Sequence, residues 1–279
     1  MATRIDGHQH FWSLKRGDYD WLTPSLAPLY WDFQPEDLKP LLDQAGINKT
    51  IVVQAASTVE ETRYLLELAD SHDFIAGVVG WVDMESNGVV TVLEELSQHP
   101  KFVGVRPMIE NIKDPAWMNQ TKLEPAFQCL IENNLCFDAL VKSIHLPHLA
   151  TLLSRHPELQ TVIDHGAKPD IAAGAWQPWA DQLSIIAGTT SAYCKVSGLI
   201  TEAAVSQSYE DLTPYLDHLL GIFGPERLIW GSDWPVLKMA GDYLGWHNAF
   251  QKWVSQLSEF EQTLIEGSNA TRFYGLEGM

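Results

Sequence analysis

Cysteine and long apolar runs are scarce in this sequence of 279 residues, and each scarcity excludes a class of protein. The three cysteines, Cys129, Cys136 and Cys194, form no C-x-x-C pair, and their odd number argues against a disulfide framework. The longest apolar run, residues 74–82, is too short to cross a bilayer as a helix. The N-terminus carries no apolar stretch of signal-peptide length. We therefore expect a soluble, cytoplasmic protein with buried free thiols.

Positive charge is also scarce. Lys and Arg total 18 against 36 Asp and Glu, which gives a formal net charge of −18. A field of that sign repels phosphate backbones and anionic lipid headgroups, so we expect neither a nucleic acid nor a membrane as partner. No phosphate-binding glycine fingerprint follows an expected strand, so a nucleotide cofactor is not indicated. These exclusions favour a small-molecule substrate, and no feature of the sequence indicates an oligomeric state.

Short apolar, β-branched runs are abundant by contrast, and each is followed by a segment that can form a helix. The expected strands are residues 4–6, 50–53, 75–81, 102–105, 136–141, 161–163, 193–196 and 228–230. Helical patterns include residues 60–70, 89–98, 123–133, 146–155 and 209–223. Strands that alternate with helices form βα units around a parallel sheet, and eight such units favour a closed (β/α)8 TIM barrel. Because no linker or change of composition divides the chain, we expect one barrel domain over residues 1–279.

The segment 13–35 is long, poor in strand signals and rich in aromatic residues and proline. Long loops inside compact domains often carry function. We interpret this segment as an extended first βα loop that partly covers the mouth of the barrel.

The first expected strand leads directly into two histidines. Barrel enzymes place their catalytic residues at the carboxyl ends of the strands. Side chains two apart on a strand share a face, so His8 and His10 can converge on one point. Two imidazoles in that arrangement suit a divalent metal site or a pair of hydrogen-bonding groups. The alternative is a pair of polar loop histidines.

Two more polar residues follow the sixth and eighth expected strands. His165 stands next to Gly166, and a core histidine with a satisfied hydrogen bond is its structural alternative. Asp233 is a lone carboxylate after residues 228–230, where it could instead cap a helix. Together with His8 and His10, these residues fall on the same rim of one barrel. That shared position predicts an active centre.

Eight short motifs stand in order along nearly the whole chain. They are residues 5–12 (IDGHQHFW), 18–22 (DYDWL), 52–55 (VVQA), 80–83 (GWVD), 103–107 (VGVRP), 163–169 (IDHGAKP), 194–199 (CKVSGL) and 231–235 (GSDWP). In these motifs the chain resembles the amidohydrolase superfamily, and within it the metal-sparing branch of sugar-lactone hydrolases. The resemblance implies a TIM barrel that opens a sugar-acid lactone, L-fuconolactone or a related aldonolactone, to the aldonic acid.

The resemblance also implies catalytic roles for His8, His10, His165 and Asp233. Lactone hydrolysis needs an activated water, a polarised carbonyl and a proton for the departing ring oxygen. We expect Asp233 to be the general base that activates the water and returns the proton. The three histidines would polarise the carbonyl, either directly or through one bound ion.

A binuclear metal centre is not expected. Superfamily members with two metals carry a bridging lysine or glutamate on strand four and a histidine on strand five. Here the corresponding strands end in Arg106 and in the region of Asp138. The same four residues, His8, His10, His165 and Asp233, would hold at most one divalent ion, zinc in the first place, and a site without any ion stays open.

Substrate-binding candidates stand at other strand ends. Arg106, Lys195 and Gln54 could pair with sugar hydroxyls or a carboxylate, whereas the alternative for the two cations is a buried ion pair with a carboxylate such as Asp138 or Asp83. Trp12, Trp31, Trp81 and Trp234 could offer a flat wall to a sugar ring, although most Trp residues simply fill space. Of these, Trp31 and Trp81 are our candidates for the pocket.

Two other functions fit the same pattern of residues. A metal-dependent decarboxylase of the same superfamily would also use an H-x-H motif with a later His and Asp. A barrel that binds a carbohydrate without turnover would need the pocket and not the base.

Overall fold

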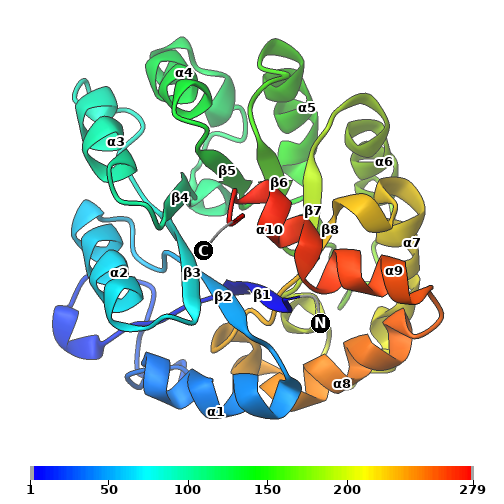
Figure 1. The fold of residues 1–279 in the computed structure, drawn as a ribbon. Helices are drawn as coiled ribbons and strands as arrows, with labels where there is room; N and C mark the ends of the chain where they lie inside the picture. Colours follow the sequence, from blue (N-terminus) through cyan, green and yellow to red (C-terminus); the bar gives the residue numbers. More distant parts are fainter. Residues whose placement is uncertain (1–2, 278–279) are drawn as a thin grey trace.

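The computed structural model describes residues 3–277, and across this range eight parallel strands pair in sequence order around a barrel (Figure 1). The strands are β1 (Ile5–Gln9), β2 (Lys49–Val53), β3 (Ile75–Gly80), β4 (Phe102–Val105), β5 (Cys136–Ala139), β6 (Thr161–Ile163), β7 (Tyr193–Val196) and β8 (Leu228–Trp230). A parallel bridge between Gln9 and Trp234 joins the end of β1 to the segment that follows β8. The predicted TIM barrel is confirmed.

Helices cover the barrel, most of them in an outer ring and the last of them across one end (Figure 1). They are α1 (Pro35–Ala45), α2 (Val59–Ser71), α3 (Val89–Ser97), α4 (Glu124–Glu132), α5 (Leu146–Arg155), α6 (Trp179–Thr189), α7 (Thr213–Phe223), α8 (Tyr243–Val254), α9 (Glu259–Thr263) and α10 (Asn269–Phe273). Side-chain caps fix some of their starts: Thr58 accepts from Glu61 N at α2, and Asp242 accepts from Gly245 N at α8. Of the helices described in residues 3–277, none is long and apolar enough to cross a membrane.

Three element boundaries differ from the sequence prediction by two residues or more. β1 continues to Gln9, so His8 lies inside the strand. β5 ends at Ala139, and α7 begins at Thr213 after a 3₁₀ turn at residues 209–212. In each case the sequence pattern shows which residues are apolar, whereas hydrogen bonds to neighbouring segments decide where an element ends.

The first βα loop folds back on itself. Trp12 and Phe33 exchange both backbone hydrogen bonds, N to O, at 3.0 and 2.9 Å. The indole Nε1 of Trp21 donates to Ala55 O at 2.7 Å, which ties the loop to the carboxyl end of β2. The segment therefore packs against the barrel mouth through Trp12 and Trp21.

The opposite end of the barrel is closed by the C-terminal segment. In Figure 1, α10 lies across the centre of the barrel. Phe273, Tyr274 and Leu276 are buried with apolar side chains from the barrel interior, among them Ile5 and Ile229. Asn269 Nδ2 donates to Leu228 O at 2.8 Å and so attaches α10 to the start of β8. This packing leaves the carboxyl ends of the strands as the place for a site.

Candidate active site

His8 and His10 face one another at the end of β1. Both are buried, at 0% and 3% exposure, and their Nε2 atoms lie 3.2 Å apart. The Nδ1 of His10 contacts Val53 O at 2.7 Å, and a carbonyl can only accept, so this nitrogen carries a proton. In the neutral ring the Nε2 of His10 therefore presents a lone pair to the site.

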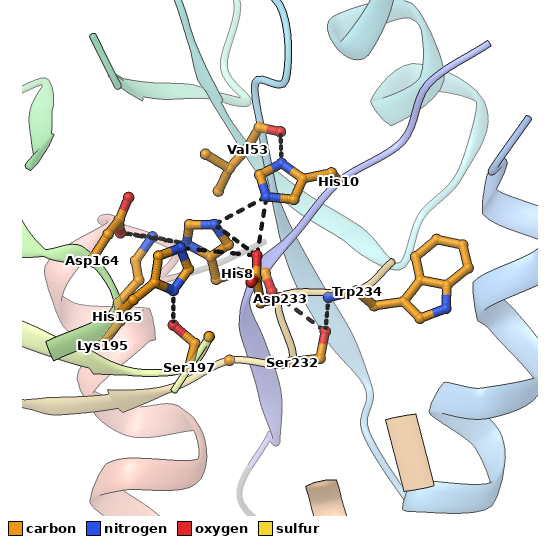
Figure 2. Close-up of polar contacts among 12 residues, drawn as sticks. His8, His10, Val53, Asp164, His165, Lys195, Ser197, Ser232, Asp233 and Trp234 are labelled. Atoms are coloured by element: carbon orange, nitrogen blue, oxygen red, sulfur yellow. Dashed lines mark hydrogen bonds and ion pairs between the residues drawn. The ribbon is translucent and has the colours of Figure 1, made fainter. Parts of the chain in front are cut away.

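Asp233 and His165 complete the cluster that the sequence predicts (Figure 2). Asp233 Oδ1 lies 3.3 Å from His10 Nε2, 3.8 Å from His8 Nε2 and 3.9 Å from His165 Nε2. The Nδ1 of His165 contacts Ser197 Oγ at 2.8 Å. The fold thus brings together all four residues, from β1 and from the ends of β6 and β8. Their catalytic roles stay predictions.

The backbone at two of these residues is strained. His165 and Asp233 have φ of 54° and 58°, a left-handed conformation that costs free energy for residues other than glycine. Ala167 and Lys168, next to His165, adopt it as well, at 61° and 48°. A Cβ at Gly198 would lie only 2.5 Å from His165 Nδ1, so glycine is needed there for the imidazole to fit. Strain of this kind typically persists where function requires the geometry.

Burial and charge set the protonation of the cluster. Burial alone would raise the pKa of Asp233, but its contacts with His165, His10 and His8 outweigh burial and hold that pKa below its ordinary value. Burial lowers the pKa of His8, and the nearby Lys195 lowers it further. Burial also lowers the pKa of His10. The result at neutral pH is an ionised carboxylate beside two neutral imidazoles, which is the state a general base requires.

One group of these residues fits a metal ion. One ligand atom each from His8, His165 and Asp233 lies within 4.8 Å of the others, and two imidazoles with a carboxylate are a common ligand set for zinc. A second group within the described residues, His8, Asp138 and Asp164, has the same spacing. There the Nζ of Lys195 already lies 2.5 Å from Asp138 Oδ2 and 3.1 Å from Asp164 Oδ1. Three of the four predicted residues, without His10, therefore fit a single divalent ion.

The pocket above the cluster is small, with a cavity volume of about 160 Å³. Drug-sized ligands occupy about 300–1,000 Å³, so this cavity suits a single small ring. Its walls come from the first loop and from several strand ends, namely His10, Trp12, Trp21, Ala55, Arg106, Met108, Glu110, Leu140, His165, Lys168, Thr201, Asp233 and Val236.

The predicted substrate-binding residues differ in how they relate to this pocket. Arg106 lines it, and its guanidinium donates to Gln54 O at 2.5 Å. Gln54 itself is buried behind Arg106, and its Nε2 donates to Arg106 O at 2.7 Å. Lys195 is fully buried beneath the cluster and makes an ion pair with Asp138, the alternative that the sequence left open.

The tryptophan candidates also differ in whether they line the pocket. Trp31 is 68% exposed and lies outside the pocket lining, although its carbonyl accepts from Trp12 Nε1 at 2.8 Å. Trp81 lines a neighbouring cavity with Asp83 and Trp117. The structure does not bring these two residues to the cluster, whereas it brings Trp12 and Trp21 there.

Sequence reasoning missed a charged pair in the pocket wall. Lys168 Nζ lies 2.9 Å from Glu110 Oε2 and 3.2 Å from Glu202 Oε1. Lys168 stands three residues after His165, and the left-handed backbone at residues 165–168 is what turns it back toward the pocket. A lysine close to His165 was visible in the sequence, but Glu110 follows no strand directly and gave no signal.

Comparisons with known proteins match nearly the whole chain. A family model described as Amidohydrolase matches residues 5–276. An L-fucono-1,5-lactonase from Burkholderia ambifaria is 42% identical over 99% of this chain and 97% of its own length. A second L-fucono-1,5-lactonase, from Burkholderia multivorans, is 33% identical over 99% of this chain and 97% of its own length.

Solved structures give the same picture. An amidohydrolase from Burkholderia multivorans, with bound zinc, superposes with a TM-score of 0.93 at 33% identity, covering 98% of this chain and 99% of its own. A dihydroxybenzoic acid decarboxylase from Polaromonas, with bound manganese, has a TM-score of 0.70 at 15% identity, covering 100% of this chain and 98% of its own. The second similarity shows a shared fold and does not favour the decarboxylase alternative.

Proposed function

Because this chain belongs to the amidohydrolase family, we propose that it hydrolyses the ring ester of a sugar-acid lactone, L-fucono-1,5-lactone or a close aldonolactone, to the aldonic acid. Two curated lactonases at 42% and 33% identity over nearly the whole chain support this activity. The observation that carries the mechanism is Asp233, a buried carboxylate with three imidazoles within 3.9 Å of its Oδ1 at the base of a small pocket.

In this mechanism Asp233 removes a proton from the attacking water. Its contacts with histidine keep it ionised at neutral pH, since they hold its pKa below the ordinary value. The same carboxylic acid then returns the proton to the ring oxygen as the ester bond breaks. The water adds one oxygen to the carbonyl carbon, and the products are a carboxylate and a sugar hydroxyl.

The oxyanion that forms at the carbonyl needs hydrogen-bond donors. Arg106 and His165 line the pocket beside Asp233 and would supply them. One donor in such a role is worth about 3 kcal/mol of transition-state stabilisation. His8, His165 and Asp233 are also the residues that would hold a divalent ion, and such an ion supplies Lewis-acid polarisation of a carbonyl when bound.

The pocket walls would bind the rest of the ring. Lys168 and Glu110 offer a charged donor and acceptor to sugar hydroxyls, and Trp12 and Trp21 offer apolar faces. We place the protein in the cytoplasm, a location supported by Cys129, Cys136 and Cys194, which are buried free thiols.

A pH-indicator assay over a panel of aldonolactones tests this proposal. Acid release should be fastest with L-fucono-1,5-lactone and slower with epimers that invert one hydroxyl. Buffer without protein corrects for spontaneous opening, which is appreciable for lactones. If no lactone in the panel releases acid above that background, the proposed function is wrong.

A further inference from the structure

Lys195 is buried at the centre of a polar network beneath the catalytic cluster. A lysine ammonium has three N–H donors and no acceptor. Three acceptors lie around Nζ of Lys195: Asp138 Oδ2 at 2.5 Å, Asp164 Oδ1 at 3.1 Å and His8 Nδ1 at 3.0 Å. The third contact requires that Nδ1 of His8 carry no proton.

The other side of the His8 ring leads to the same conclusion. Nε2 of His8 lies 3.2 Å from His10 Nε2 and 3.8 Å from Asp233 Oδ1. Both of those atoms are acceptors, because the His10 proton is on Nδ1, which contacts Val53 O. A proton on His8 Nε2 donates to His10 Nε2, whereas a lone pair there would face two others. The Nη1 of Arg106, which can only donate, lies farther from the same nitrogen than His10 does, at 3.4 Å.

The competing tautomer of His8 would use two longer contacts. With its proton on Nδ1, His8 would donate to Asp164 Oδ1 at 3.4 Å and accept at Nε2 from Arg106 at 3.4 Å. It would also place two donors face to face at the 3.0 Å contact with Lys195. The two tautomers hold the same number of protons, so the choice between them is made by hydrogen-bond geometry.

This choice bears on metal binding because a metal needs the lone pair of Nε2. A histidine ligand commonly donates its other ring nitrogen to a carboxylate, which fixes the metal-binding tautomer. In this chain Asp164 is placed for that contact, but Lys195 lies closer to the same nitrogen. Lys195 and Asp164 thus favour opposite tautomers of His8.

We propose that Lys195 is a positioning residue that holds His8 with its proton on Nε2, as a hydrogen-bond donor toward His10, and that Asp164 is the partner that would favour a metal-binding His8. The proposal goes beyond the proposed function, because each of its contacts joins residues of this chain.

The direct measurement is nitrogen NMR on the whole wild-type protein with labelled histidine. Its ¹⁵N shifts distinguish protonated from unprotonated ring nitrogens, and His8→Gln identifies the signals of His8. We expect a protonated Nε2 and an unprotonated Nδ1. The opposite assignment would overturn the proposal.

Zinc affinity provides the second measurement, by competition with a chromophoric chelator. Partners of a metal-bound histidine change metal affinity by about 10–100-fold. Lys195→Met should therefore bind zinc about 10–100-fold more tightly than wild type, and Asp164→Asn should bind it more weakly. An unchanged or reversed order would overturn the proposal.

Removing Lys195 leaves two buried carboxylates without their cation, which could prevent folding. The double variant Lys195→Met with Asp138→Asn removes one charge of each sign and should show the same gain in zinc affinity. Tyr274→Phe is the matched control, because Tyr274 donates to the same Asp138 Oδ2 at 3.0 Å and does not contact His8. If Tyr274→Phe raised zinc affinity as much, general loosening would explain the effect and the proposal would be wrong.

These readouts need no lactone. A protein that opened no lactone would disprove the proposed function and leave the tautomer and zinc results intact. An active enzyme with His8 protonated on Nδ1 would disprove the tautomer proposal and leave the proposed function intact.

Discussion

The two ends of the barrel bury different kinds of side chain. At the carboxyl ends of the strands, His10, His165 and Asp233 are buried together around a small cavity. At the amino ends, Phe273 and Leu276 from the C-terminal segment fill the barrel with apolar contacts. Buried titratable groups in contact with one another lower stability unless their hydrogen bonds are satisfied, whereas apolar burial raises it. The carboxyl end is therefore built for chemistry and the amino end for stability.

Backbone conformation follows the same division. Of the described residues other than glycine with positive φ, His165, Ala167, Lys168 and Asp233 lie at the carboxyl end. The remaining one is Asn134, in the turn before β5, and asparagine tolerates this conformation well. Strain is thus concentrated where the side chains must converge.

The largest expected effect comes from the base. Asp233→Asn should lower kcat for lactone opening by about 10²–10⁴-fold, because a general base contributes that much. The free energy of unfolding should hardly fall, since the variant removes a charge from a buried cluster. Initial rates and urea denaturation measure the two quantities. Activity near the wild-type level would disprove the assignment of Asp233.

A substitution at the amino end of the barrel should lower stability and leave the kinetics of lactone opening unchanged. Phe273 is buried against Tyr193, with ring centroids 4.9 Å apart, and against Tyr274. Phe273→Ala should reduce the free energy of unfolding by about 3–5 kcal/mol. kcat and KM, measured where the variant is still folded, should remain those of the wild type. A lowered kcat in folded protein would mean that packing at the amino end affects the chemistry at the carboxyl end, against the division of roles described above.

A smaller effect is expected in the pocket wall. Lys168→Met removes a charged donor beside Glu110, and hydrogen bonds to charged groups are worth about 1.5–3 kcal/mol, so KM should rise by about 10–100-fold with little change in kcat. Lys142→Met is the control, because Lys142 also contacts Glu110, at 3.4 Å, but lies outside the pocket lining. Equal effects of the two variants would show that Glu110, and not contact with substrate, is responsible.

The smallest effect is expected in the first loop. Trp31→Ala should leave KM unchanged because this side chain is 68% exposed, whereas Trp21→Ala should raise KM because Trp21 lines the pocket. Steady-state kinetics with the preferred lactone compare the two. A rise in KM for Trp31→Ala would mean that the loop closes over the bound substrate.

Much of the fold follows from local patterns. The expected strands at residues 102–105, 161–163, 193–196 and 228–230 have the same bounds as β4, β6, β7 and β8. Apolar, β-branched runs of this length predict the strands of a parallel barrel well, because both faces of each strand are buried. The H-x-H spacing likewise placed two imidazoles on one face of β1, since side-chain direction alternates along a strand.

The sequence by itself determined the barrel, the family and the residue types at the strand ends, because each depends on neighbours close in the chain. It could not determine which cations reach the pocket. Lys195 lies at the end of a strand as predicted, yet its contact with His8 joins residues 187 positions apart. Only closure of the barrel decides that Lys195 is buried beneath His8 while Lys168 lines the wall. The proton on His8 depends on those same long-range contacts, and so it was decided by the tertiary structure alone.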